Sequence, residues 1–258
     1  MKKQTSKSWQ VITLILTLAL MLCAAWFVPL GINWLCVSIA LALFITLVSF
    51  YVTGRPGGIF VNERNLMSLG RFQAVIWTVI ILSAYLTIVF ARLKAGTVQD
   101  PLGVALDWHL WALMGISTTS LVGTPLLLNE KKAKQPDPKV LPKTAADLNE
   151  SQQQIIDNKE GILYANDSAS DAAFTDMFQG DELQNTAQMD LAKVQMFLFT
   201  IIVALTYCVI LFNTLKEHAP DPTGLEALPS LSDGMVALIG ISHAGYLTSK
   251  TVTHTKTV

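Results

Sequence analysis

The chain contains Leu113-Met114-Gly115-Ile116-Ser117 and, much later, the closely similar Leu238-Ile239-Gly240-Ile241-Ser242. A second pair of similar segments, 68–78 and 190–200, precedes these two in the same order. Matching segments that recur in one order and at similar spacing indicate an internal duplication, which decides the fold and has to be recognised first. The sequence therefore predicts two copies of one structural unit.

The amino-acid composition excludes an ordinary soluble domain. Hydrophobic residues make up 52% of the 258 positions and charged residues only 14%, whereas roughly a quarter of a soluble domain is charged. Five runs contain no Asp, Glu, Lys or Arg: 8–54, 72–91, 108–129, 194–215 and 234–249. The first run is long enough for two bilayer crossings of about 20 residues and the next three for one each, whereas the last is short.

We therefore predict an all-α membrane protein with six transmembrane helices, at about 11–30, 32–53, 72–92, 108–128, 191–213 and 232–249. Lys and Arg predict its orientation, because they favour cytoplasmic loops. With the N-terminus inside, the outer loops hold only Arg92, Lys94 and Lys216 of the 18 basic residues. Both termini are thus predicted to be cytoplasmic, and the two copies to be parallel repeats of a two-helix hairpin.

This topology divides the chain into four parts. They are an N-terminal hairpin (1–53), the first repeat hairpin (54–128), a polar cytoplasmic loop (129–190) and the second repeat hairpin with a short cytoplasmic tail (191–258). Ser68 and Asp190 occupy matching places before the third and fifth spans, where their side chains suit helix N-caps. A cleaved signal peptide is the alternative for the first span, although the apolar run continues through Trp26-Phe27-Val28.

The loop 129–190 differs from the rest of the chain in being rich in charged and amide residues. Because it has few apolar side chains to bury, we expect most of it to be a weakly ordered linker. Ile155 and Ile156 indicate one short helix, starting at about Ala145.

A second apolar island in this loop consists of Phe174, Met177 and Phe178, before Gly180. Their i, i+3, i+4 spacing predicts an amphipathic turn that ends at a C-cap glycine. The apolar face of that turn needs a partner, either the membrane helices, the bilayer surface or another protein. We take these three residues as candidate docking residues for a cytoplasmic protein.

Small residues recur at every fourth position in both copies of the repeat. They are Gly115, Thr119 and Gly123 in the fourth span and Gly240, Ala244 and Thr248 in the sixth. Such a face lets membrane helices approach closely, so helix packing and self-association are the predicted role.

Polar side chains within the spans form a candidate pore or polar site. They are Ser117, Thr118, Thr119, Ser242 and His243, with Gln73 and Gln195 at the helix starts. Such groups line aqueous paths, but more often they bond to their own backbone or to a neighbouring helix. An ionisable residue such as His243 inside a span suggests a functional site, although Thr118 replaces it in the other copy.

Several functions are disfavoured. Spans without acidic or basic side chains argue against an ion-coupled transporter or a voltage sensor, and the four histidines are too scattered for a metal site. No nucleophile elbow or nucleotide loop is present, so we expect no cofactor and no enzyme activity. A net charge of −1 gives no reason to expect nucleic acid, and all three cysteines lie in predicted spans, which implies no disulfide framework.

Five segments of the sequence resemble an uncharacterised family of bacterial multi-pass inner-membrane proteins over about 54–250. They are Ser68-Leu69-x-Arg71-Phe72-Gln73, Trp77-Thr78, the two Gly-Ile-Ser segments and Asp176-Met177-Phe178-x-Gly180-Asp181-Glu182. The resemblance implies a bacterial inner membrane and brings no activity, cofactor or site residue.

The leading hypothesis is a non-catalytic integral membrane protein of the inner membrane that self-associates in the bilayer. It would act as a scaffold or membrane subunit that docks a cytoplasmic protein. The alternative is a channel or pore for ions or small solutes, lined by the fourth and sixth spans, and a third hypothesis is a facilitator for a neutral solute.

Overall fold

The computed structural model describes residues 7–96 and 99–258. These residues form eight α-helices and three 3-10 helices, with isolated β-bridges and no strand. The chain divides into two compact units. The helical unit comprises Met1–Ile59, Val75–Trp111 and Val203–Ser232, and the cap unit comprises Phe60–Ala74, Ala112–Ile202 and Asp233–Val258.

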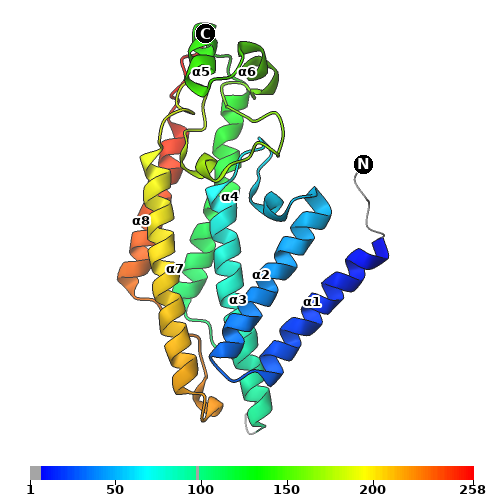
Figure 1. Cartoon of the computed structure of the whole chain (residues 1–258). Helices are drawn as coiled ribbons and strands as arrows, with labels where there is room; N and C mark the ends of the chain where they lie inside the picture. Colours follow the sequence, from blue (N-terminus) through cyan, green and yellow to red (C-terminus); the bar gives the residue numbers. More distant parts are fainter. Residues whose placement is uncertain (1–6, 97–98) are drawn as a thin grey trace. The chain divides into compact units, whose positions relative to one another are not determined.

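Five of the helices are long and apolar enough to cross a membrane. They are α1 (Lys7–Phe27), α2 (Ile32–Thr53), α3 (Leu69–Ala95), α4 (Trp108–Lys132) and α7 (Leu191–Glu217), labelled in Figure 1. The first five predicted spans fall on these helices, which indicate a multi-pass membrane protein. The last predicted span falls on α8 (Asp233–Thr251), which is not among the five.

Helices α3 and α7 begin where the sequence predicts. The Ser68 hydroxyl accepts a hydrogen bond from the Arg71 amide at 3.5 Å, and the Asp190 carboxylate accepts one from the Lys193 amide at 3.2 Å. In both cases the donor is the third residue of the helix, which is the position that an N-cap side chain satisfies. Both predicted N-caps are confirmed.

The helical unit contains the α1–α2 hairpin, which packs on α3 and is drawn in blue in Figure 1. Its turn uses Gly31, whose φ of 94° suits glycine, and the Gly31 amide donates to Asn33 Oδ1 at 3.1 Å. The Trp34 indole of α2 donates to the Ser83 hydroxyl of α3 at 3.0 Å. Two short 3-10 helices, Pro56–Phe60 and Pro222–Gly224, lie in the connections that follow α2 and α7.

The cap unit contains a folded segment between α4 and α7, residues 133–190, which we call the cap. It holds α5 (Val140–Leu148), α6 (Gln152–Asn158) and a 3-10 helix (Phe174–Phe178). The expectation of a weakly ordered linker is therefore wrong. The cap has a core of buried side chains, to which the loop before α3 adds Leu66. The core residues are Leu66, Val140, Ala145, Ile155, Tyr164 and Leu183. The few apolar side chains of the cap are enough for it to fold, because several of its charged residues are paired in the interior rather than exposed to solvent.

The single helix expected around Ala145 is two helices. Asn149 ends α5 in the left-handed conformation, with φ of 55°. Ser151 then starts α6 with a capping box, in which its hydroxyl accepts from the Gln154 amide and the Gln154 side chain accepts from the Ser151 amide. As a result Ile155 is buried, while Ile156 is 43% exposed.

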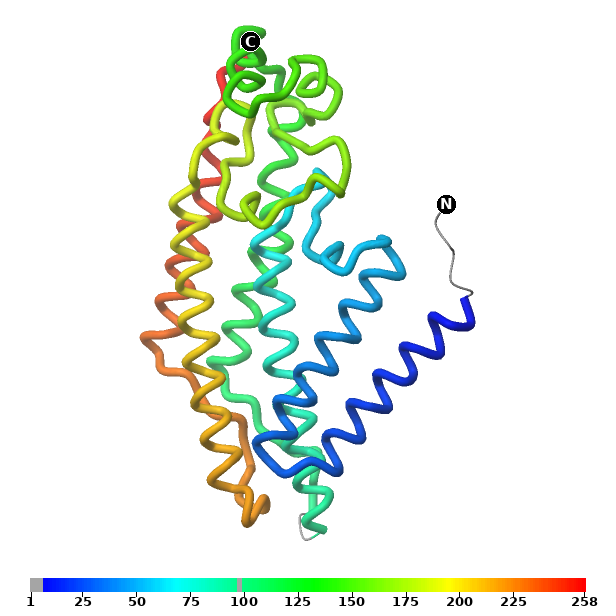
Figure 2. The backbone as a smooth tube through the Cα atoms, viewed as in Figure 1, coloured from blue at the N-terminus to red at the C-terminus, as the bar shows by residue number. Residues whose placement is uncertain are grey.

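The C-terminal tail, residues 252–258, completes the cap unit. Figure 2 traces this tail, in red, to the start of the cap, in green. The Asp137 amide donates to the Lys256 carbonyl at 2.9 Å, and the Val258 amide donates to the Gln135 carbonyl at 3.2 Å. The tail is thus fixed along the chain that leaves α4.

Substitution of Gly161 by Ala is expected to destabilise the cap unit strongly. Gly161 has a φ of 64°, and an added Cβ would lie 2.4 Å from the backbone carbonyl oxygens of both Lys131 and Lys132. Gly96 is the matched control, because its φ of 71° is similar but no atom of the described residues beyond its chain neighbours lies within 4 Å of an added Cβ. Gly96→Ala should therefore cost only about 1 kcal/mol of backbone strain.

Thermal unfolding followed by circular dichroism checks this prediction. We expect a clearly larger drop in Tm for Gly161→Ala than for Gly96→Ala, because steric overlap adds to the strain only at Gly161. Equal drops would show that the contact with the end of α4 is absent.

Candidate functional site

The most unusual feature of the cap unit is a buried cluster of charged side chains, which we call the ion-pair cluster. It consists of Arg64, Asp181, Asp190, Lys193 and Lys250. Asp181 lies at its centre: Oδ1 is 2.7 Å from Arg64 Nη2 and 3.2 Å from Lys193 Nζ, and Oδ2 is 2.5 Å from Lys250 Nζ. One carboxylate of the cap therefore contacts α7, α8 and the loop before α3.

Further hydrogen bonds fix the members of the ion-pair cluster. Arg64 Nη1 donates to the carbonyl oxygens of Tyr164 and Asp181, both at 3.0 Å. Lys250 Nζ also lies 3.0 Å from Asp190 Oδ2 and 4.6 Å from the centre of the Tyr246 ring. Buried charges are tolerated only when partners and hydrogen bonds replace water, and this arrangement supplies both.

The electrostatics of the cluster keep Asp181 ionised. Burial raises the pKa of its carboxyl, but the charges of Lys193, Lys250 and Arg64 act in the opposite direction and hold it well below its usual range. Asp176 lies near this region and behaves differently. Burial raises the pKa of Asp176, against amide hydrogen bonds from Met67 and Ala173 that lower it.

Acidification is expected to destabilise the cap unit. The folded pKa of Asp181 lies below its unfolded value of about 3.9. Its stabilising contribution is therefore complete above that value and is lost as the pH falls through the folded pKa. Asp176 has the opposite sign, because its raised pKa favours the folded state on protonation. We expect Asp181 to dominate because three buried cations depend on it.

Circular dichroism melts between about pH 6 and about pH 2 measure this effect. Wild-type Tm should fall over the acid part of the range, and the fall should be smaller in Asp181→Asn, which has no carboxyl to protonate at that position. An equally steep fall in both proteins would assign the acid sensitivity to other groups.

A second buried ion pair lies next to the cluster. Glu182 Oε1 is 2.7 Å from Lys131 Nζ at the end of α4. Its other oxygen, Oε2, accepts hydrogen bonds from the amides of His254 and Thr255 at 2.8 and 2.6 Å. Glu182 therefore joins the cap to α4 and to the C-terminal tail.

The candidate pore residues occupy two different environments. Gln73, Ser117, Ser242 and His243 are buried in the cap unit, whereas Thr118 and Gln195 are exposed. His243 Nδ1 lies 2.6 Å from the Ser120 hydroxyl, and Gln73 Nε2 donates to Thr200 Oγ1 at 2.6 Å. Thr119 is exposed as well, so the structure brings four of the seven residues into one interior and leaves three on the surface.

The six small residues are also divided. A Cβ at Gly123 would lie 3.5 Å from Leu247, and one at Gly240 would lie 3.7 Å from Ile116, so these two sit where α4 meets α8. The other four are not at this contact. Gly115, Thr119, Ala244 and Thr248 are exposed, and both threonine hydroxyls donate to the carbonyl oxygen four residues earlier.

The candidate docking residues are packed largely against their own chain. Met177 is buried with Leu69, Met196 and Tyr246, and Phe178 packs against the same cluster. Phe174 is 52% exposed and contacts the rings of Phe72, Phe178 and Phe197. The predicted turn is a 3-10 helix that ends at Phe178 with Gln179 as its C-cap, so Gly180 is not the C-cap.

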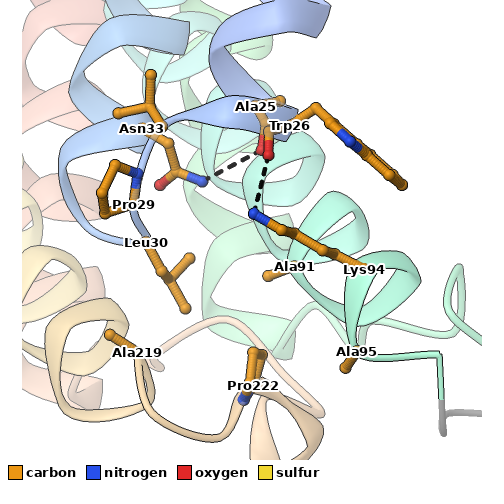
Figure 3. Close-up of a pocket in the computed structure, with 11 residues that line it drawn as sticks. Ala25, Trp26, Pro29, Leu30, Asn33, Ala91, Lys94, Ala95, Ala219 and Pro222 are labelled. Carbon is orange, nitrogen blue, oxygen red and sulfur yellow. Dashed lines mark hydrogen bonds between the residues drawn. The ribbon is translucent and has the colours of Figure 1, made fainter.

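Figure 3 shows a pocket of about 340 Å³ in the helical unit, between the ends of α1 and α3 and the start of α2. Two polar side chains face it. Lys94 Nζ donates to the Trp26 carbonyl at 3.2 Å, and Asn33 Nδ2 donates to the Ala25 carbonyl at 3.5 Å. Because these donors satisfy the carbonyl end of α1, their role is structural.

Sequence reasoning missed the ion-pair cluster. Its signals were the adjacent acids Asp181-Glu182 and basic residues at the ends of spans, Lys193 near the start of the fifth and Lys250 directly after the predicted sixth. Basic residues at the ends of spans are ordinarily a signal of sidedness, which hides a pairing role. Among the described residues, no group of three or more His, Cys, Asp or Glu side chains could hold a metal ion.

Helices of membrane-spanning length together with an ion-paired cap place the chain in a broad class, the multi-pass helical membrane proteins. Comparisons of the chain with protein-family models, with curated proteins and with solved structures give no match.

Proposed function

We propose that the protein is a non-catalytic subunit of a bacterial inner membrane that holds a folded cytoplasmic cap against its membrane helices. In this proposal α8 is the sixth span, and both termini and the cap are cytoplasmic. The hairpins α3–α4 and α7–α8 are the two copies of a tandem parallel repeat. This function requires no cofactor.

The contact that carries this proposal is the one made by Asp181, a cap carboxylate bonded to Lys193 of α7 and Lys250 of α8. A passive linker has no need of buried charges that fix its orientation. A binding platform does, because a surface held in one geometry loses less conformational entropy when a partner binds. The cap is therefore proposed as the surface through which the protein acts.

Phe174 is the proposed centre of a docking surface for a cytoplasmic protein. It is the exposed member of an otherwise packed aromatic group, and rigid aromatic anchors are typical of interface hot spots. A photo-crosslinking residue at position 174 should give one discrete protein adduct in intact cells. The same residue at exposed Ile156, on α6, is the matched control and should not. If the residue at position 174 forms adducts only with lipid and with the protein's own chain, the proposed cytoplasmic partner is excluded.

Self-association is proposed through the exposed small residues of α4 and α8. Gly115 and Ala244 leave room for a second copy at membrane depth, where small residues favour close helix contacts. Cysteines at Thr119 or Thr248 should then form intermolecular disulfides in native membranes. Exposed Leu205 on α7 provides a control position with a large side chain.

Impermeant thiol labelling tests the proposed topology. Cys23, Cys36 and Cys208 are first replaced by Ala, and a single cysteine is then placed at Lys143 in the cap or at exposed Ala219 after α7. In intact spheroplasts, position 219 should label and position 143 should not, while both should label after permeabilisation. The reverse pattern would place the cap outside and contradict the proposal.

A pore along α4 and α8 is the second proposal. It is favoured by the buried Ser117 and Ser242 hydroxyls, which make no hydrogen bond within the described part of the chain. Thr118, however, is exposed and does not share their interior. Reconstituted protein that gives no conductance in any tested salt would eliminate this function.

A further inference from the structure

Four buried polar atoms in the cap unit have neither a hydrogen-bond partner nor an ion-pair partner in the described part of the chain. They are Gln73 Oε1, Ser117 Oγ, Ser242 Oγ and His243 Nε2. Their side chains are between 0% and 5% exposed. Buried polar atoms in folded proteins are nearly always bonded to protein or to ordered water, so four such atoms from three helices require an explanation.

The contacts between helices place these four residues at a similar level. An added Cβ at Gly70 of α3 would lie 3.4 Å from Leu121 of α4, and Gln73 lies about one turn further along α3. The chain reverses direction between α3 and α4 (Figure 1), which brings Gln73 towards the level of Ser117. Ser120, next to Leu121 on α4, contacts His243 of α8. The four residues therefore lie within roughly two helical turns, about 11 Å.

Neighbouring hydroxyls show that the two serines are exceptional. Thr119, Thr124 and Thr248 each donate to the carbonyl oxygen four residues earlier, as hydroxyls in membrane helices commonly do. Ser117 and Ser242 make no such bond. Their hydroxyls are therefore available to a ligand inside the unit.

The other two residues are oriented by the bonds that they already make. Gln73 Nε2 faces the Met196 carbonyl at 3.5 Å and the Thr200 hydroxyl at 2.6 Å. The Thr200 hydroxyl could also donate to an amide oxygen, but a reversed amide would place Oε1 against the Met196 carbonyl, which only accepts, so Oε1 is assigned as the unbonded atom. His243 uses Nδ1 towards Ser120, which leaves Nε2 as a donor or an acceptor according to the tautomer.

We propose that these four residues, which we call the polar layer, form a water-binding site that bridges α3, α4 and α8. The set contains one obligate acceptor, two hydroxyls that both donate and accept, and one imidazole nitrogen. It contains no carboxylate or ammonium group to balance an ion. Water has two donors and two acceptors and usually takes about three partners in protein interiors, which matches this set.

A polar seam between α4 and α8 connects the polar layer with the cap end of the unit. The hydroxyl oxygens of Thr124 and Tyr246 lie 3.2 Å apart, and Lys250 lies over the Tyr246 ring one turn further on. A void of about 10 Å³ beside Lys250, large enough for one water molecule, borders Asp190 and His254. The same two residues line an open groove of about 310 Å³. Water therefore enters from the cap end. The water site is an addition to the proposed function, in which the cap is anchored to the helices, and it does not require the protein to conduct ions.

Water-edited solid-state NMR tests the proposal on full-length protein in lipid bilayers. His109, His218 and His254 are replaced by Gln, so that ¹⁵N-labelled imidazole reports on His243 alone. We expect magnetisation from water to reach the His243 ring several-fold faster than it reaches the amide of Val37, which is fully buried in α2. Transfer as slow as at Val37 would overturn the proposal.

Substitution of the two serines tests whether they hold the water. In Ser117→Ala with Ser242→Ala, transfer from water to His243 should fall several-fold. In Thr119→Val it should not change, because that hydroxyl is bonded to its own helix. If transfer from water to His243 stays rapid in the double variant, other groups hold the water, and the proposed site is wrong.

Thermal unfolding is an independent test of the same site. If Ser117 binds water, Ser117→Ala removes a used hydrogen bond and should lower Tm. If the hydroxyl is buried dry, its removal relieves an unsatisfied group and should raise Tm, which would contradict the proposal.

Discussion

Asp181→Asn is expected to lower the free energy of unfolding of the cap unit by about 3–5 kcal/mol, the usual cost of breaking a buried ion pair. Asparagine has almost the same volume, so the loss reflects charge rather than packing. Arg64, Lys193 and Lys250 are all buried against this carboxylate. Removing its charge leaves three cations with only the partly exposed Asp190 to balance them.

Urea or thermal unfolding in detergent measures this loss. Asp147→Asn is the matched control, because Asp147 lies exposed on α5 and its substitution should cost less than about 0.5 kcal/mol. Adding Lys193→Met to Asp181→Asn should recover part of the stability, since an apolar side chain no longer needs the carboxylate. Equal stability of the two single variants would show that the cluster does not hold the cap.

The helices of the membrane region were predictable because their signal is local. Runs without charge predicted the five long helices, and the chemistry of Ser68 and Asp190 predicted two of their first residues. Each inference needed only one segment of chain, since a membrane helix satisfies its own backbone hydrogen bonds.

The cap was not predictable in the same way because its stability depends on pairs that are distant in sequence. Arg64 and Asp181 are 117 positions apart, and Lys131 and Glu182 are 51 apart. Composition treats each of these charges as solvated, which makes the segment look too polar to fold. Once paired, the same charges are compatible with burial and tie the cap to the helices.

The polar layer was predicted by residue type but not by orientation. In a soluble helix the polar side marks the surface, whereas helices in lipid are apolar on nearly all sides and lose that periodicity. Ser117 and Thr118 are neighbours with similar chemistry, yet the first is buried and the second exposed. Only helix contacts, such as Ser120 with His243, determine which side faces inward.

Glu182→Gln is expected to release the C-terminal tail and to cost about 3–5 kcal/mol, although the two side chains have nearly the same shape. One carboxylate oxygen of Glu182 contacts the Lys131 ammonium, and the other accepts the amides of His254 and Thr255. Every one of these partners is a donor. A glutamine must turn its NH₂ group towards one side or the other, so a donor then faces donors in a buried site.

The release of the tail can be separated from general unfolding by hydrogen exchange. In Glu182→Gln, the amides of Asp137 and Val258, which bond between the tail and the start of the cap, should lose protection. Amides within α2 should keep theirs. Glu130→Gln is the matched control, because Glu130 is an exposed acid on α4 next to Lys131 and should leave both sets unchanged. If Asp137 and Val258 stay protected in Glu182→Gln, the backbone contacts of the tail are enough to hold it in place. The role of Glu182 is then limited to pairing with Lys131.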